Sequence, residues 1–170
     1  MREQLQPVAT ALAERFGAEI QEFRGDVTLM ISSGQLVPTC QALRDEFGFD
    51  FLEEETAVDY WPAQEPRFHV VYQVYSIKKH LRLGLRVPVS ALSPSVPTLE
   101  GVYPNANWFE REIWDMFGIR FEGHSDLRRI LMPYDWQGHP LRKDYPLGYE
   151  EVQFSFDAGE IDQDKPYAKE

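Results

Sequence analysis

The chain has 170 residues, of which 43% are hydrophobic and 14% aromatic, with a formal charge of -11 and a pI near 4.8. This length suits one domain with a real hydrophobic core, and the apolar content excludes a disordered chain. The negative charge disfavours nucleic acid and anionic lipid as partners, because both bind to basic surfaces.

Targeting and redox signals are weak in this sequence. No apolar run approaches the roughly 20 residues that a membrane-spanning helix needs. Residues 1–16 are amphipathic and carry Glu3 and Glu14, which is typical of neither a signal peptide nor a transit peptide. Cys40 is the single cysteine, so the chain has no internal disulfide and cannot ligate an iron–sulfur cluster alone. These features predict a soluble cytoplasmic domain.

The first half of the chain alternates helical and strand-like patterns. Apolar residues at helical spacing followed by Gly17 or Gly48 predict helices, and short β-type runs between turn residues predict strands. In chain order, we predict a helix over 3–16, strands over 19–23 and 27–32, and a helix over 38–47.

The middle of the chain reads as a sheet. Residues 49–60 predict a strand, but the acidic run Glu53-Glu54-Glu55 indicates a solvated turn beside it. Residues 68–77 are rich in Val and Tyr and predict a central strand. Residues 80–87 alternate apolar side chains with arginine or glycine, the period of a sheet with one wet face, and Lys78-Lys79 predicts a hairpin turn.

Prolines separate this sheet from a third predicted helix. Residues 90–104 are proline-rich and predict a loop, after which a helix fits 105–117 and ends at Gly118. The whole pattern predicts an α+β fold, a two-layer domain with helices packed on a mixed, mostly antiparallel sheet. We expect a core over 1–132 and an extended irregular tail over 133–170, rich in proline and aromatic residues and then acidic.

The third helix holds the candidate chemistry. Glu112 and Asp115 share one helix face and suit an acid/base pair or half of a metal site. The alternative is that Arg111 pairs with Asp115 while Glu112 is solvated or bridges to a nearby arginine. Further ligands at recognisable spacing, zinc motifs, GxGxxG and a P-loop are all absent from the sequence. We therefore predict no catalytic, cofactor-binding or metal-binding residue in this chain.

Residues 127–146 mix arginines and aromatics in a proline-rich stretch. Such a mixture can bind single-stranded nucleic acid by stacking, but Asp126, Asp135 and Asp144 offset its positive charge. The composition is also typical of protein interfaces. An ordinary loop that wraps its own domain explains it equally well.

The two stretches together resemble a known family. The motif is Glu110-Arg111-Glu112, two spacers, Asp115, two apolar residues, six spacers, His124, three spacers, Arg128, one spacer and Ile130-Leu131. Its continuation through Trp136, His139 and Asp144 to Pro146 fits as well. This pattern, over about 104–152, resembles the thirty-kilodalton (C) subunit of the proton-pumping NADH:quinone oxidoreductase, respiratory complex I.

The resemblance implies a cofactor-free structural and assembly subunit of the hydrophilic arm. It would pack on the quinone-site (D) subunit, near the iron–sulfur (B) subunit, in a complex that carries FMN, iron–sulfur clusters and quinone. The protein would support electron transfer from NADH to quinone coupled to proton translocation without catalysing it. It would lie peripherally at the cytoplasmic face of the bacterial plasma membrane. The chain's end at Glu170 leads us to expect a protein that is not fused to the quinone-site subunit.

The resemblance also suggests roles for residues. The helix acids and Arg111 are expected to form a charge network with Arg128, Arg129 or a neighbouring subunit, with Arg128 holding a carboxylate. The tail from Pro133 is expected to wrap a partner and to order on binding. The expected signature and interface residues are Glu110, Arg111, Glu112, Asp115, His124, Arg128, Arg129, Tyr134, Trp136, His139, Arg142, Lys143, Asp144 and Tyr145.

Two other functions stay open on the sequence alone. One keeps the fold and changes the machine, to a membrane-bound nickel–iron hydrogenase or a dehydrogenase complex with another electron donor. The other is a stand-alone carboxylate enzyme built on Glu112 and Asp115.

Overall fold

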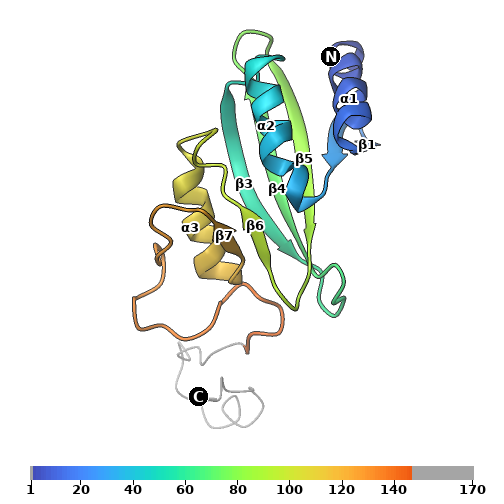
Figure 1. The fold of residues 1–170 in the computed structure, drawn as a ribbon. Helices are drawn as coiled ribbons and strands as arrows, with labels where there is room; N and C mark the ends of the chain where they lie inside the picture. The colour runs from blue at the N-terminus through green and yellow to red at the C-terminus, as the bar shows by residue number, and fades with distance from the viewer. Residues whose placement is uncertain (1, 147–170) are drawn as a thin grey trace, which may run out of the picture.

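The structure is a computed structural model that describes residues 2–146 (Figure 1). In chain order its elements are α1 (Arg2–Phe16), β1 (Glu19–Phe23), β2 (Asp26–Met30), the 3-10 helix η1 (Ser33–Gln35), α2 (Leu36–Asp45), β3 (Phe51–Asp59), β4 (Phe68–Ser76), β5 (Leu81–Val89), β6 (Ser95–Pro97), α3 (Ala106–Phe117) and β7 (Arg120–Glu122). The tail predicted over 133–170 is described only to residue 146, where it contains no helix or strand, and its acidic end lies outside the described residues.

Five strands form the main sheet, in the order β1-β2-β5-β4-β3. All neighbouring pairs are antiparallel except β2 and β5, which run parallel. Buried strand residues such as Leu29, Leu85 and Tyr72 lie on one face and join residues of the three helices in one core. The predicted α+β fold, with helices packed on a mixed, mostly antiparallel sheet, is confirmed. Between residues 2 and 146, no helix is long and apolar enough to cross a membrane.

The boundaries of the predicted elements lie within two residues of the observed ones. The β1–β2 hairpin turns through Arg24 and Gly25, both at positive φ (51° and 100°), which suits a two-residue hairpin turn. The short strands β6 and β7 were not predicted. They pair in parallel over three residues each, too few to produce a periodic pattern.

One prediction for the sheet was wrong. Glu53, Glu54 and Glu55 lie inside β3 and not in a solvated turn. The pairing register with β4 shifts between Leu52 and Glu54, which marks a bulge. After this bulge Glu54 is exposed, whereas Glu55 points into the core and is only 3% exposed.

Gly118 ends α3 in the left-handed conformation, with φ 72°, and Gly17 follows α1 at φ 67°. A Cβ added at Gly17 would meet no atom within 4 Å. At Gly118 it would lie 2.5 Å from the His139 ring and 2.6 Å from the Arg142 guanidinium. The two glycines therefore have the same backbone constraint but different surroundings.

We expect Gly17→Ala to lower the free energy of unfolding by about 1 kcal/mol, through backbone strain alone. Gly118→Ala should lower it by about 2 kcal/mol or more, because the methyl group also displaces His139 and Arg142. Urea unfolding of both variants measures the difference. Equal losses would contradict the close packing of residues 139–142 on the end of α3.

Candidate functional site

The site is built on α3, which packs against β3 through Ile113, Met116 and Phe117. These three side chains are buried, and Phe109 on the same face is half-buried. Around α3 curves the irregular stretch of residues 128–146, here called the C-terminal segment (Figure 1). Its attachment to α3 decides what the helix acids do.

Asp115 is fully buried and binds the start of the C-terminal segment. Its Oδ2 accepts hydrogen bonds from the backbone N–H groups of Ile130, Leu131 and Met132, at 3.1, 2.9 and 2.9 Å. Its Oδ1 accepts from the Arg129 guanidinium. Burial raises the pKa of Asp115, but these hydrogen bonds more than offset it and leave the pKa below its usual range. Asp115 is therefore an ionised, fully satisfied carboxylate.

Two arginines complete this junction. Arg111 donates to the backbone carbonyls of Arg128 and Arg129, each at 3.2 Å. Arg129 donates to the carbonyls of Trp136 and Gly138 at 2.7 and 3.0 Å, which closes the intervening residues into a loop. Each guanidinium thus satisfies carbonyls of a segment that has no regular structure of its own.

The expected network includes a pair between Asp115 and Arg129, which the structure contains, but two other pairings that the sequence suggested are absent from the described residues. Arg111 does not pair with Asp115, because Arg129 takes that place. Arg128 does not hold a buried carboxylate among the described residues, since its guanidinium pairs with Asp126 at 2.8 Å on the surface. Glu112, which was weighed as the acid partner of Asp115, is exposed.

The C-terminal segment also caps α3. The last carbonyls of a helix have no N–H partner within the helix and need outside donors. His139 Nδ1 lies 3.0 Å from the Asp115 carbonyl oxygen. The Leu141 N–H donates to the Met116 carbonyl at 3.0 Å, and Arg142 Nε donates to the Phe117 carbonyl. A carbonyl only accepts, so Nδ1 carries the proton of His139. The Arg142 charge also suits the negative end of the helix dipole.

Glu110, in the turn before Asp115, holds the other side of the helix. It is fully buried, and its carboxylate accepts from the Leu99 N–H at 2.6 Å and from the Thr98 hydroxyl. Burial raises its pKa, and the bonds from Thr98 and Leu99 oppose that shift. His124 Nε2 lies 3.9 Å from this carboxylate. Glu110 therefore connects α3 to the loop that follows β6.

A second anchor, which sequence reasoning missed, holds the far end of the segment. Arg67 is 5% exposed and binds Asp59 through Nε and Nη2 at 2.9 and 2.8 Å. The same guanidinium binds Asp144 through Nη1, at 2.8 Å, and through Nη2. The Lys143 N–H donates to Asp59 at 2.9 Å. The family signature includes Lys143 and Asp144, but residues so distant in sequence carry no local spacing signal, so nothing linked these two to Arg67 and Asp59.

The remaining predicted residues lie on the outside of the segment. Tyr134 is 95% exposed and Trp136 41%, beside Leu131 at 60% and Leu141 at 53%. The Tyr145 hydroxyl donates to the Gln137 carbonyl at 3.2 Å. The backbone of the described segment thus wraps its own domain, which was one of the two alternatives, and Met132 packs against the core, while Leu131, Tyr134, Trp136 and Leu141 stay on the surface.

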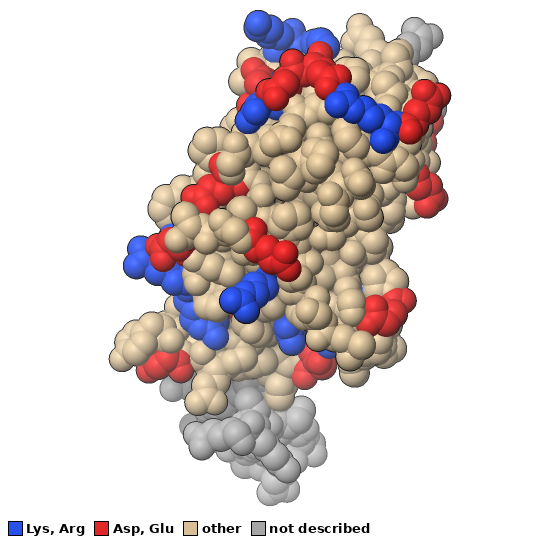
Figure 2. All heavy atoms as spheres, in the orientation of Figure 1, with Lys and Arg blue, Asp and Glu red and all other residues tan. Residues whose placement is uncertain are grey.

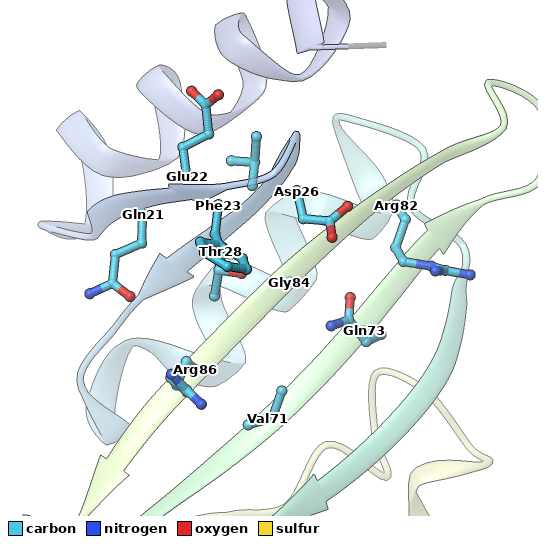
Figure 3. A pocket seen from close by; sticks show the side chains of 11 residues that line it. Gln21, Glu22, Phe23, Asp26, Thr28, Val71, Gln73, Arg82, Gly84 and Arg86 are labelled. Atoms are coloured by element: carbon cyan, nitrogen blue, oxygen red, sulfur yellow. The ribbon is translucent and has the colours of Figure 1, made fainter.

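The chemistry available elsewhere in the described chain is limited. Among residues 2–146, no group of three or more His, Cys, Asp or Glu side chains is placed to hold a metal ion. A hollow of about 520 Å³ lies over the other face of the sheet, with Thr28, Gly84 and Gln73 in its lining (Figure 3). Of the arginines that line this hollow, Arg82 forms an ion pair with Glu53 at 2.6 Å. On the face drawn in Figure 2, lysines and arginines alternate with acids and form no broad basic patch among the described residues.

Comparison with known proteins identifies the chain. Residues 29–151 match the family described as the 30 kDa subunit of respiratory-chain NADH dehydrogenase. A relative from Roseiflexus sp. (strain RS-1), named as the C subunit of NADH-quinone oxidoreductase, is 52% identical over 151 residues, which cover 88% of this chain and 86% of the relative. A protein of the same name from Geobacter sulfurreducens is 47% identical over 139 residues, covering 80% of this chain and 86% of the relative.

Two solved structures are similar to this chain. A trypsin-resistant fragment (1-134) of Nqo5 has a TM-score of 0.64 and 32% identity, covering 73% of this chain and 99% of the fragment. A chain of an archaeal membrane-bound sulfane sulfur reductase complex has a TM-score of 0.66 over 97% of this chain and 98% of its own length. At 20% identity that second likeness shows the fold alone.

The fold and the matched residues define a subunit of a respiratory-chain NADH dehydrogenase. Specifically, the chain belongs to the 30 kDa subunit family, that of the C subunit of NADH-quinone oxidoreductase. The resemblance found in the sequence is confirmed.

Replacing Arg129 by Ala should lower the free energy of unfolding by about 2 to 4 kcal/mol, because a buried carboxylate loses its cation. The adjacent Arg128→Ala should change it by less than about 0.5 kcal/mol, since its ion pair is exposed. Urea unfolding of the two variants measures both effects. Equal effects would contradict the assignment of the buried contact to Arg129.

The Asp59 anchor predicts a pH dependence. Burial raises the pKa of Asp59, but the bonds from Arg67, Lys143 and Trp61 outweigh it and bring the pKa to about 2. The folded pKa lies below the unfolded value of 3.8, so this stabilisation is present above pH 3.8 and is lost as the pH falls towards 2.

We expect wild type to lose about 2 kcal/mol of unfolding free energy from this group between pH 5 and pH 2. Asp59→Asn should be less stable than wild type at pH 6. Between pH 5 and pH 2, however, its unfolding free energy should fall by about 2 kcal/mol less than that of wild type. Glu112→Gln, at an exposed acid, is the control and should follow wild type. Parallel curves for Asp59→Asn and wild type would rule out the depressed pKa.

Proposed function

We propose that the chain is a non-catalytic, cofactor-free structural subunit of the hydrophilic arm of NADH-quinone oxidoreductase. In this proposal it supports the quinone-reducing module during electron transfer from NADH to quinone, which is coupled to proton translocation. It would pack on the quinone-site (D) subunit, near the iron–sulfur (B) subunit, at the cytoplasmic face of the bacterial plasma membrane. Its own task would be to recognise and position other subunits.

One observation carries this proposal: Arg111, Asp115 and Arg129 of the signature are used within the chain to fasten the C-terminal segment, while several of its large apolar side chains face outwards. Asp115 and Arg129 lie beneath the segment, and Leu131 and Tyr134 lie on top of it. Tyrosine, tryptophan and arginine are enriched at the centres of protein interfaces. Clustered exposed apolar side chains mark an interaction surface.

The geometry disfavours a carboxylate enzyme. A general base needs to reach a substrate proton. Asp115 is fully buried and already accepts four hydrogen bonds, whereas Glu112 is exposed. The two carboxylates thus face different environments. Turnover of a substrate by the purified chain would contradict the proposal.

Assembly provides the direct test. The double variant Leu131→Ser/Tyr134→Ala should lower incorporation of the tagged chain into the complex by at least about tenfold, because two exposed apolar contacts are removed. Its free energy of unfolding should stay within about 0.5 kcal/mol of wild type. Incorporation is measured by mass spectrometry of the subunits that co-purify from detergent-solubilised membranes.

Leu92→Ser is the control, because Leu92 is 90% exposed but lies far along the chain from the C-terminal segment. It should assemble normally. Undiminished incorporation of the double variant, or recovery of the wild-type chain as a lone monomer, would contradict the proposed docking role.

A further inference from the structure

Glu55 is a core residue that the docking role does not use. The bulge in β3 turns its side chain inwards, where it is 3% exposed. In the strand register it stands opposite Tyr72 of β4, so the two side chains project from the same face of the sheet. Thr39 and Cys40 of α2 are also fully buried, and Cys40 belongs to the same core.

The environment of Glu55 differs from that of the other buried acids. Asp115 and Asp59 each bind an arginine and backbone N–H groups, and Glu110 binds a hydroxyl and an N–H. Within the described residues, both carboxyl oxygens of Glu55 are buried without a geometrically well-formed hydrogen bond. The same holds for the Tyr72 hydroxyl and the Thr39 hydroxyl.

Among the described residues, no cation compensates a charge at this position. The ionisable groups around Glu55 are acids: Glu110 from α3 and Tyr72 from β4 act on Glu55, and Glu55 in turn raises the pKa of Cys40 from α2. An ionised carboxylate placed there would be desolvated and unpaired, and a buried group in that position takes up a proton instead.

We propose that Glu55 is a proton-binding site of the folded chain, a carboxylic acid at neutral pH whose side chain faces that of Tyr72. Folding then takes one proton from solvent and places it on Glu55. In agreement, burial raises the pKa of Glu55 well above its usual range, and the Glu110 charge adds to this, while Tyr72 opposes it.

The proton makes the core pH-sensitive in the direction opposite to Asp59. Because the folded pKa of Glu55 lies above the unfolded value of 4.5, its contribution to stability is complete below pH 4.5 and declines as the pH rises. Between pH 4.5 and the folded pKa of Glu55, the folded chain holds about one more proton than the unfolded chain. The unfolding equilibrium constant should therefore rise about tenfold per pH unit from this group.

The test compares Glu55→Gln with wild type and with Glu54→Gln, the exposed neighbour on the same strand. Unfolding equilibria are measured on the full chain between pH 5.5 and 8, below the range in which Cys40 and Tyr72 lose protons. The proposal expects Glu55→Gln to lack the tenfold change per pH unit, whereas Glu54→Gln keeps it. Identical pH dependence in all three proteins would overturn it.

Infrared spectroscopy gives a second readout that needs no unfolding. Folded wild type at pH 7 should show the carbonyl band of a protonated carboxylic acid, which shifts in Tyr72→Phe and persists in Glu110→Gln. Persistence of the band in folded Glu55→Gln would assign the proton to another carboxyl group and overturn the proposal. Absence of the band in wild type would do the same, even if Glu55→Gln did not fold.

Discussion

The carboxylate of Asp115 is the contact on which the candidate site depends. Three successive backbone N–H groups and one guanidinium converge on it, an arrangement in which neighbouring amides form a concave anion site. Once residues 130–132 are bound there, Arg129 is placed to hold the carbonyls of Trp136 and Gly138. The loop that follows then reaches the end of α3 and supplies its missing donors. Each contact therefore presupposes the previous one.

Buried charged residues hold the C-terminal segment in place, because its exposed side chains do not pack against the core. The described C-terminal segment has no helix or strand, so its backbone groups need partners in the core. Asp59 accepts from the Lys143 N–H at one end, where Arg67 also holds the Asp144 side chain, and Asp115 and Arg111 bind backbone groups at the other. Buried ion pairs add little net stability, because desolvation offsets the attraction, but losing one member is costly. The arrangement therefore specifies one path for the segment more than it strengthens the fold.

Sequence reasoning found the elements whose signals are local. The apolar stripe of α3 and the glycine at its end predict that helix, and the alternation in β5 predicts its wet face. The inward position of Glu55 was hidden because three successive glutamates usually indicate solvent, and the bulge decides that Glu55 and not Glu54 points into the core. The Arg67 cluster joins residues distant in the chain, so no spacing reveals it. The family motif specified Arg128, but side-chain geometry gives the buried contact to Arg129.

The buried acids show how one fold holds carboxyl groups in different states. Asp115 and Asp59 have cationic and backbone donors, which keep their pKa values low and their charges in place. Glu110 has neutral donors and a raised pKa, and Glu55 lacks both cations and well-formed bonds among the described residues. The ionised acids lie where the C-terminal segment must be fastened, whereas Glu55 lies between sheet and helices. Charge thus organises the edge of the domain that we propose for docking, whereas Glu55 in the core behind it is the acid that we propose to be neutral.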